Sequence, residues 1–544
     1  MLPRFRLYSS YSVWVILAVM FLALLYNLGG WGVLETSEAR YAEISREMLV
    51  SGDWLHPRLL GILHYHKPPF TYIISATGLS LFGVNGFGVR FFLQVSLLIQ
   101  GVLVYRLAKE LFRNQKIAMA ALLIYFSMPA VLVSARNLTT DSYLATFELL
   151  AIWAWVKYKQ VKAPAWLYLF YIALALAFLT KGPVGLIFPV LVVIGLSNYS
   201  SGVEKSSLIA HQLIGLAIFL ILGASWYLYL MLQDRQFVDY FLMRHVVERY
   251  ANPEAFSRSK PWWFYIVLAP ALSLPWSAIL LFNFKQLQRL EKHFKKLFIV
   301  WLLVPLLFFS FSGSKLLLYI LPWFAGPALI CAWLLYQLPD TTKRKVAAWG
   351  IVYYTVLAGA FLLIPILPVD LPIPYWVYSL PLLMLLCLYL IWKSRNNTVV
   401  KLLLGSASFT ILLLPFSTYL LAANPSLSNS STALAQALQA KELRYRQVVV
   451  YDKLLPSLAF ELNRNFVTIQ ANSRSLNRET QFETDTKWKD HFLQLNKQED
   501  STALASLLRK NVVLVVKGDL PEEKQWLIKH LHRKRKAGKW SIYF

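Results

Sequence analysis

Long apolar runs constrain this chain more than any other feature. The 544 residues are 57% hydrophobic and the mean hydropathy is +0.49. Many runs approach the roughly 20 residues that a helix needs to cross a bilayer, and soluble domains do not carry this composition. We therefore predict a polytopic α-helical membrane protein. About thirteen spans are expected, near residues 11–30, 88–105, 117–134, 142–157, 164–180, 183–198, 209–231, 262–284, 297–312, 316–338, 346–367, 374–392 and 402–421.

The basic residues indicate how these spans are oriented. Arg4 and Arg6 precede the first span, which we expect to be uncleaved, and basic clusters recur between later spans. Lys and Arg concentrate on the cytoplasmic side of membrane proteins, so these clusters and the N-terminus are predicted to be cytoplasmic. The formal charge of +26 then needs no nucleic-acid partner. The clusters lie at residues 106–116, 157–162, 285–296, 341–345 and 393–397.

One short apolar segment decides this topology. Residues 70–83 are apolar but too short for an ordinary crossing, which favours a helix lying in the membrane interface. If the segment crossed, every later basic cluster would lie outside. With thirteen spans, the chain after residue 422 lies on the outer side.

The two cysteines, Cys331 and Cys387, both fall in apolar spans, so neither a disulfide framework nor a cysteine zinc site is expected.

The predicted outer loops carry charged residues at the edges of spans. They are residues 31–87, 136–141, 180–183, 232–261 and 312–315. Ionisable groups at membrane depth are costly, and they are functional candidates for that reason. Because all of these groups fall on one face, we expect an active site at the outer side of the membrane.

The chain changes character after residue 422. A linker-like stretch, N-P-S-L-S-N-S-S-T, is followed by short apolar runs at 447–451, 466–469 and 511–516, which predict buried strands. Helical patterns are expected at 454–463, 501–509 and 521–534. We predict a small α/β domain over residues 423–544, with the basic run at 532–536 either against anionic headgroups or at a solvated helix end.

Five motifs in order resemble a known family. They are E-A-R-Y-A-E-I-S-R-E-M-L from Glu38, H-Y-H-K-P-P from His64, T-K-G from Thr180, H-V-V-E-R-Y from His245 and K-L-L-L-Y-I-L-P from Lys315. Over roughly residues 11–340 the chain resembles the bacterial branch of the dolichyl-phosphate-mannose protein mannosyltransferases. Within that branch it is similar to the 4-amino-4-deoxy-L-arabinose transferases of lipid A.

The resemblance implies a GT-C glycosyltransferase fold. The catalytic membrane domain would cover residues 1–422, including the first periplasmic loop at 31–87, and residues 423–544 would form the periplasmic α/β domain. The implied reaction is inverting transfer of a sugar from a polyprenyl phosphate, such as undecaprenyl phosphate. Lipid A, another glycan or a protein would be the acceptor, at the periplasmic face of a bacterial inner membrane.

The resemblance also assigns roles to individual residues. Glu38, with help from Asp141, is expected to orient or activate the acceptor, since a carboxylate can take the proton of a hydroxyl. Charge builds on the departing phosphate, and Arg and Lys stabilise such charge in a water-poor site. The positions expected around that phosphate are Arg40, Tyr65, Lys67, Lys181, His245, Arg249, Lys315 and Tyr319.

Two positions depart from the family pattern. Ser37 stands where an Asp usually precedes the Glu, which leaves the acceptor-activating role to Glu38 or Glu35; an acceptor phosphate would need no base at all. His66 stands where the aminoarabinose transferases carry a Glu.

His64 and His66 could bind a divalent metal together with Glu38, since histidine and carboxylate suit zinc. The alternative is that both histidines contact substrate or interface, and no cofactor is required.

Two other functions compete with the transferase. A transporter or flippase of lipid-linked sugars would be expected to show repeated halves, and no such symmetry is visible. An oligosaccharide ligase that uses a diphosphate-linked glycan is chemically closer. Either way, the expected partners are a lipid-linked sugar and membrane lipids.

Overall fold

A computed structural model describes residues 7, 10–35, 37–196, 205–241, 260–312, 315–368, 371–473 and 479–544. The chain divides into two compact units. Residues Met1–Asn27 with Leu93–Leu420 form the first, called here the membrane unit, and Leu28–Phe92 with Leu421–Phe544 form the second, called the sheet unit. The sequence placed residues 31–87 with the membrane helices, whereas the structure groups this loop with the C-terminal residues.

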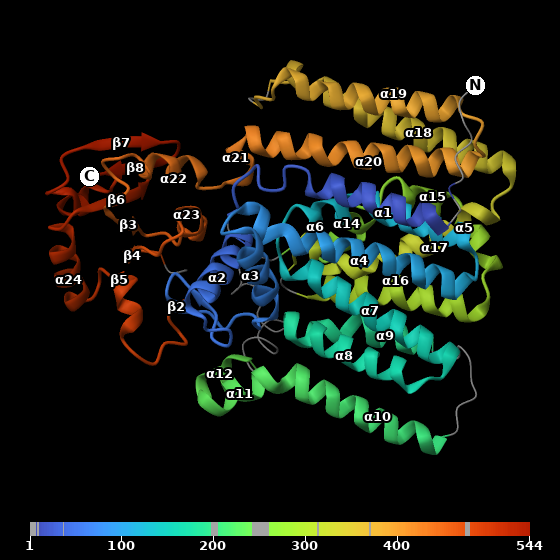
Figure 1. Cartoon of the computed structure of the whole chain (residues 1–544), viewed down its shortest axis with the longest axis horizontal. Helices are drawn as coiled ribbons and strands as arrows, with labels where there is room; N and C mark the ends of the chain where they lie inside the picture. The colour runs from blue at the N-terminus through green and yellow to red at the C-terminus, as the bar shows by residue number, and fades with distance from the viewer. Residues whose placement is uncertain are drawn as a thin grey trace. The chain divides into compact units, whose positions relative to one another are not determined.

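The membrane unit is built from apolar helices (Figure 1). Its α-helices are α1 (Ser10–Leu25), α4 (Gly86–Phe112, which begins in the sheet unit), α5 (Gln115–Phe126), α6 (Pro129–Ala135), α7 (Thr140–Val161), α8 (Pro164–Lys181), α9 (Ile187–Gly195), α10 (Lys205–Phe219), α11 (Ser225–Gln233), α12 (Arg235–Asp239), α14 (Phe264–Ala271), α15 (Trp276–Phe282), α16 (Lys292–Phe311), α17 (Ala325–Gln337), α18 (Asp340–Leu362), α19 (Ser379–Lys393) and α20 (Thr398–Ala423). Short 3-10 or π turns join several of them: η1 (Gly182–Leu186), η2 (Leu220–Ala224), η5 (Phe284–Arg289), η6 (Leu317–Phe324), η7 (Ile364–Ile366) and η8 (Tyr375–Tyr378).

Among the described residues, 8 helices are long and apolar enough to cross a membrane, or up to 10 if each of two bent pairs is one span. The bent pairs are α5 with α6, at 62°, and α14 with α15, at 106°. The sequence-based expectation of about thirteen spans also counts α1, α7 and a separate α9. Helix α1 is a shorter apolar helix, and α7 carries several charged residues. The stretch Pro164–Gly195 passes as one candidate, although Gly182, at φ +77°, ends α8.

Polar side chains inside the membrane unit fix the rotation of α7. Gln100 of α4 donates to the carbonyl of Ser142 at 2.7 Å and accepts from the Tyr125 hydroxyl at 2.6 Å. The hydroxyls of Ser96 and Thr146 lie 2.6 Å apart. Buried polar groups of this kind are stable only when paired, so the network specifies one face of α7. The beginning of α7, which carries Asp141, is thereby held in place.

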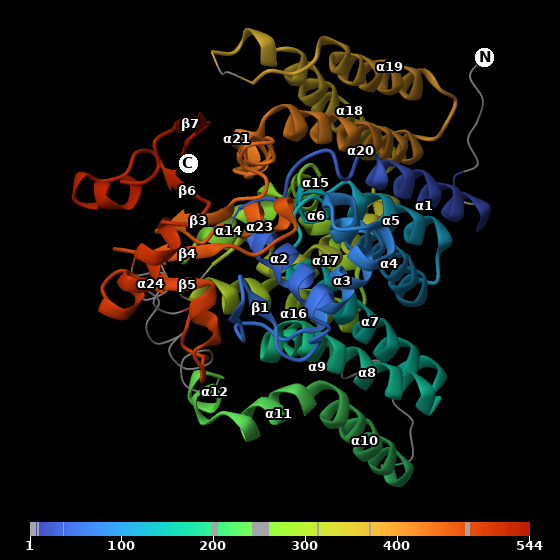
Figure 2. The ribbon, with the colours of Figure 1, turned by 60° about the vertical axis from the view of Figure 1, so that its left-hand side comes forward.

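The sheet unit contains one mixed sheet with the order β5-β4-β3-β6-β8-β7. Strands β5, β4, β3 and β6 are parallel neighbours, while β8 is antiparallel to β6 and to β7. Figure 2 shows β6, β3, β4 and β5 following one another. The elements are α2 (Ser37–Ser51), β1 (Arg58–Leu59), β2 (Ile62–Leu63), α3 (Phe70–Phe82), α21 (Pro425–Ser428), α22 (Thr432–Leu438), β3 (Gln447–Tyr451), α23 (Pro456–Leu462), β4 (Val467–Gln470), η10 (Lys487–Asp490), β5 (Phe492–Gln494), α24 (Gln498–Leu508), β6 (Val512–Lys517), η11 (Glu522–Ile528), β7 (Lys534–Ala537) and β8 (Trp540–Tyr543).

Both faces of this sheet are buried, which explains why its strands read as continuous apolar runs. Val448 and Val450 of β3 face a core shared with α22, α23 and helix α2 of the first polar loop. Val449 faces the opposite core, where α24 and η11 pack. The first polar loop therefore contributes a helix to the packing of a sheet formed more than 400 residues later.

Helix α2 is tied into the sheet unit by its acidic and basic residues. Arg46 donates to both carboxylate oxygens of Glu43, at 2.8 and 2.6 Å, and also to the side chain of Asn465. Ahead of α2, Glu35 accepts the backbone N–H of Ser457 at 2.8 Å and so caps the beginning of α23. Burial raises the pKa of Glu35, against the hydrogen bonds from Ser457, which lower it. These contacts hold α2 and α23 in place within the sheet unit.

The C-terminal end differs from the prediction. The expected strands at 447–451, 466–469 and 511–516 are confirmed, and the helices near 454–463 and 501–509 appear as α23 and α24. The expected helix at 521–534 is wrong. Only the 3-10 turn η11 forms, and β7 and β8 make a hairpin in which Ala537 pairs with Trp540. Gly538, at φ +57°, allows the two-residue turn, and the basic run at 532–536 runs into an edge strand that its lysines protect from further pairing.

The hairpin β1–β2 supports a stability prediction. Leu60 and Gly61 both have positive φ, of +55° and +80°, as a two-residue hairpin turn requires. The Gly61 N–H donates to both oxygens of Glu47, and a Cβ on Gly61 would meet the His491 ring. Gly61→Ala is expected to lower the free energy of unfolding by about 1–3 kcal/mol, measured by thermal unfolding. Gly52→Ala is the control, since Gly52 has φ +70° and no neighbour within 4 Å. An equal effect of both substitutions would contradict the prediction.

Candidate active site

The membrane unit brings three of the expected site residues together. The Lys181 ammonium at the end of α8 forms an ion pair with the Asp141 carboxylate in the first turn of α7, and it lies 4.0 Å from the centroid of the Tyr319 ring. Lys181 and Asp141 are both 6% exposed. Thr139 caps α7, so Asp141 is not needed as the cap and its carboxylate is directed to Lys181. The arrangement is a buried cation that lies between an acid and an aromatic ring.

A fourth residue, Glu148, extends this cluster. It follows Asp141 by two turns on the same face of α7, is fully buried and interacts electrostatically with Lys181 and Asp141. Neither of its carboxylate oxygens has a hydrogen-bond partner among the residues that the structure describes. A lone acid inside a predicted span is a functional candidate by its position, and this signal was present in the sequence.

Lys315 does not share in these contacts. It is 4% exposed, and its ammonium donates to the backbone carbonyl of Lys260 at 2.9 Å. His245 and Arg249 lie outside the described residues, so their predicted roles stay predictions.

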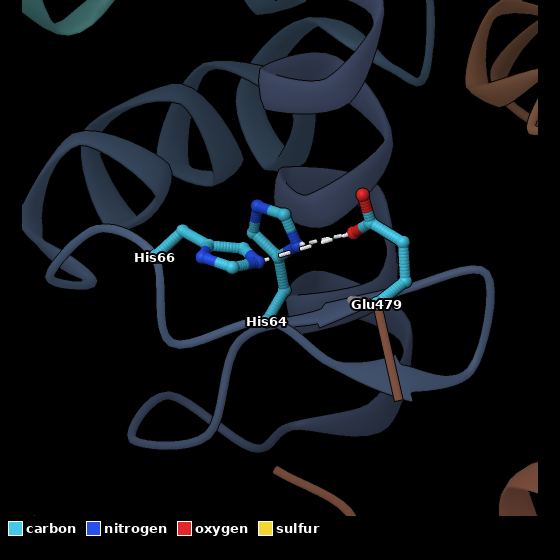
Figure 3. Close-up of side chains that lie close together, drawn as sticks. All are labelled: His64, His66 and Glu479. Atoms are coloured by element: carbon cyan, nitrogen blue, oxygen red, sulfur yellow. Dashed lines mark ion pairs between the residues drawn. The ribbon is translucent and has the colours of Figure 1, made fainter. Parts of the chain in front are cut away.

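The sheet unit gathers a second set of expected residues around Glu479, which sequence reasoning did not identify. The Glu479 Oε2 atom lies 3.6 Å from His64 Nδ1 and 4.0 Å from His66 Nε2, and Oε1 lies 3.6 Å from Arg40 Nη2 (Figure 3). His64 is 6% and Glu479 3% exposed. Three residues of the first polar loop therefore meet at one carboxylate from the C-terminal part of the chain.

This carboxylate is held in its ionised form. Burial by itself would raise the pKa of Glu479, but its interactions with His64, Arg40 and His66 outweigh burial. The pKa of Glu479 therefore lies well below its usual range. The residues around Glu479 are basic, and its carboxylate places a stable negative charge among them.

Tyr65 lies between the two histidines in the sequence, and Lys67 follows them. The Tyr65 ring packs against Phe482 at 5.3 Å between centroids, and the His66 ring packs against Phe482 at 5.4 Å. Leu63, just before His64, donates its N–H to Glu483 at 2.6 Å. These contacts fix the backbone from which the Lys67 side chain extends.

Glu38, the expected acceptor-activating residue, forms a buried ion pair with Arg90. Its two oxygens accept Arg90 Nε at 2.8 Å and Nη2 at 2.9 Å, and the Leu34 N–H donates to it at 2.7 Å. Both Glu38 and Arg90 are 0% exposed. Arg90 also donates to three carbonyls within residues 28–32 and stacks on Trp31. A carboxylate paired in this way holds helix α2 in place, and its role toward the acceptor stays a prediction. The carboxylate beside His64 and His66 is that of Glu479 and not that of Glu38.

Sequence reasoning missed Arg90 and Glu479 for different reasons. Arg90 is a lone cation at the beginning of an apolar span, a position that already suggests a buried partner. Glu479 lies in a polar stretch with no motif, and only the fold brings it to residues more than 400 positions earlier.

Comparison with known proteins shows the family to which the chain belongs. The sequence model of dolichyl-phosphate-mannose-protein mannosyltransferases matches residues 10–241. An undecaprenyl phosphate-alpha-4-amino-4-deoxy-L-arabinose arabinosyl transferase 2 of Pseudomonas fluorescens is 30% identical over 393 residues, which is 70% of each chain. The chain belongs to this family of glycosyltransferases. It is therefore a multi-pass membrane enzyme that transfers a sugar.

Other relatives and two solved structures are similar to the chain as well. An arabinosyl transferase 1 of the same description from Proteus mirabilis is 32% identical over 318 residues, covering 58% of this chain and 57% of the relative. The crystal structure of ArnT from Cupriavidus metallidurans bound to undecaprenyl phosphate superposes with a TM-score of 0.77 at 20% identity, over 98% of both chains. Its apo structure gives a TM-score of 0.78. At this identity the likeness shows a common fold, which confirms the expected GT-C architecture with a C-terminal sheet domain.

Proposed function

We propose that this enzyme moves a sugar from an undecaprenyl-phosphate-class donor to an acceptor at the periplasmic face, with lipid A as the first acceptor to test. The names of the relatives specify an undecaprenyl-phosphate aminoarabinose donor for those proteins. The topology that supports this reaction has a cytoplasmic N-terminus, and it places the outer loops and the C-terminal domain in the periplasm.

The observation that carries the proposal is the buried group formed by Lys181, Asp141 and Tyr319. A donor phosphate can replace Asp141 as the partner of Lys181, because both groups are oxyanions that an ammonium can pair with, and the charge on the phosphate grows as the sugar departs. Lys181 then stabilises the charge that builds on the leaving phosphate. The Tyr319 ring, 4.0 Å from the Lys181 ammonium, holds that ammonium in position by a cation–π contact.

The displaced carboxylate has a role in the same step. Asp141, once released from Lys181, accepts the proton of an acceptor hydroxyl while the acceptor oxygen attacks the anomeric carbon. Attack from the face opposite the departing phosphate inverts the configuration. If the acceptor is a phosphate of lipid A, it is already ionised, and Asp141 serves only to orient it.

The first polar loop supplies further candidates for phosphate binding. Arg40 suits bidentate contact with a phosphate, and Lys67 provides a point charge. The Tyr65 hydroxyl can donate a hydrogen bond. In the membrane unit Lys315 is kept as a candidate, and His245 and Arg249 enter from the resemblance alone.

Mass spectrometry of lipid A and membrane glycolipids tests the proposal in cells with and without the gene. A pentose- or hexose-type mass lost from lipid A, with accumulation of the polyprenyl-phosphate sugar, is the expected result. Accumulation of that donor with unchanged lipid A would keep the transferase and move the acceptor to another glycan or a protein. If no polyprenyl-linked pool changed, the proposed donor would be wrong.

A further inference from the structure

We propose that His64, His66 and Glu479 form a site for one divalent transition metal ion, for which zinc is the best chemical match. The inference goes beyond the transfer reaction and does not depend on it, because metal content is measured directly. The ligands would be His64 Nδ1, His66 Nε2 and Glu479 Oε2, and all three atoms lie within 4.8 Å of one another.

The geometry suits an ion at the centre of these atoms. Figure 3 shows both imidazole rings turned toward the same carboxylate oxygen, at 3.6 and 4.0 Å. Zinc bound tetrahedrally at about 2.0–2.1 Å holds its ligand atoms about 3.4 Å apart. Side-chain movements of less than about 1 Å would therefore complete the site. Two histidines and one carboxylate form a common zinc ligand set that leaves the fourth position for water or a substrate oxygen.

The distances differ from those of a simple histidine–carboxylate pair in the same loop. His56 Nδ1 lies 2.9 Å from Asp53 Oδ1, which is the length of a direct hydrogen bond. His64 and His66 instead lie farther from their shared oxygen than a normal hydrogen bond. At these distances a metal ion fits between the two ring nitrogens and the Glu479 oxygen.

The neighbours of the cluster act as an outer layer of support. Arg40 lies 3.6 Å from the other oxygen of Glu479, so Oε2 is left facing the histidines. Ligating carboxylates commonly have such a partner, which orients them. Phe482 packs against the His66 ring and restricts its orientation. Because His64 and Glu479 are buried, few water molecules can reach an ion at this site and replace its protein ligands.

A bound metal would connect two distant parts of the sheet unit. Residues 64–66 precede Lys67, the proposed phosphate-binding residue, and Glu479 belongs to the C-terminal chain. The hydrogen bond from the Leu63 N–H to Glu483 already joins the same segments. The metal would add a stronger link and fix the direction from which Lys67 extends.

The test measures zinc on the full-length protein purified in detergent. Metal content is determined without chelator, and zinc is then titrated into the chelator-treated protein in competition with a coloured chelator. One zinc per chain is expected for the wild type. His64→Ala and Glu479→Gln are expected to lose at least tenfold in zinc affinity, whereas His56→Ala, in the same loop, is expected to bind as the wild type does.

Two further measurements separate metal binding from a merely structural cluster. Glu479→His removes the partner of Arg40 but restores a three-ligand set, so it is expected to regain zinc that Glu479→Gln has lost. Cobalt in place of zinc is expected to give the visible absorption of a tetrahedral site in the wild type and in Glu479→His. No stoichiometric zinc in the wild type would overturn the proposal, as would equal zinc affinity of the wild type and Glu479→Gln.

Discussion

Glu38→Gln is expected to destabilise the protein by about 3–5 kcal/mol, the usual cost of leaving one member of a buried ion pair without its partner. Arg90 donates two hydrogen bonds to Glu38 and is itself 0% exposed. Glutamine can accept one hydrogen bond but cannot neutralise the guanidinium. Thermal unfolding of the detergent-solubilised chain measures the effect, and turnover falls with it because α2 carries Arg40.

The control for this prediction is an exposed pair in the same unit. Glu442 contacts Arg533 and Arg535 at the surface, and Glu442→Gln is expected to cost at most about 1 kcal/mol. The double variant Glu38→Leu with Arg90→Met is expected to recover part of the loss, since it removes both charges. A Glu38→Gln protein with wild-type thermal stability and no turnover would instead return Glu38 to the acceptor-activating role.

Lys181→Ala is expected to lower kcat/KM by about 10²–10³, the usual effect of removing one group that stabilises developing negative charge. The same substitution should weaken binding of undecaprenyl phosphate, because the buried ammonium is the proposed phosphate partner. Lys157→Ala is the matched control, since Lys157 pairs with Glu110 at 3.1 Å and lies at the other end of α7.

Asp141→Asn separates the two members of this pair. It frees Lys181, so undecaprenyl phosphate is expected to bind at least as tightly as to the wild type, while transfer to a hydroxyl acceptor is lost. Retained transfer would indicate a phosphate acceptor that needs no base. Equal loss of phosphate binding in Lys181→Ala and Asp141→Asn would contradict the proposed exchange of partners and assign the pair a structural role.

The order of spans, loops and strands could be predicted because it depends on local pattern. Apolar runs, basic clusters and strand-length valine runs each report on a few neighbouring residues, and β3, β4 and β6 lie where those runs predicted them. The hairpin β7–β8 was missed because the Lys- and Arg-rich residues 532–536 have little apolar alternation. Their strand depends on pairing with β8, a partner that local pattern does not reveal.

By itself the sequence determined that this is a polytopic membrane protein with a C-terminal α/β domain and a charged first loop. It also identified Asp141, Lys181 and Tyr319 as site candidates, and the fold brings these three into contact. Only the tertiary structure decided that Glu38 belongs to Arg90, that Glu479 meets His64 and His66, and that residues 28–92 pack with the C-terminal chain. The physical reason is that a buried charge must find a partner, and which partner it finds depends on how segments far apart in the sequence pack together.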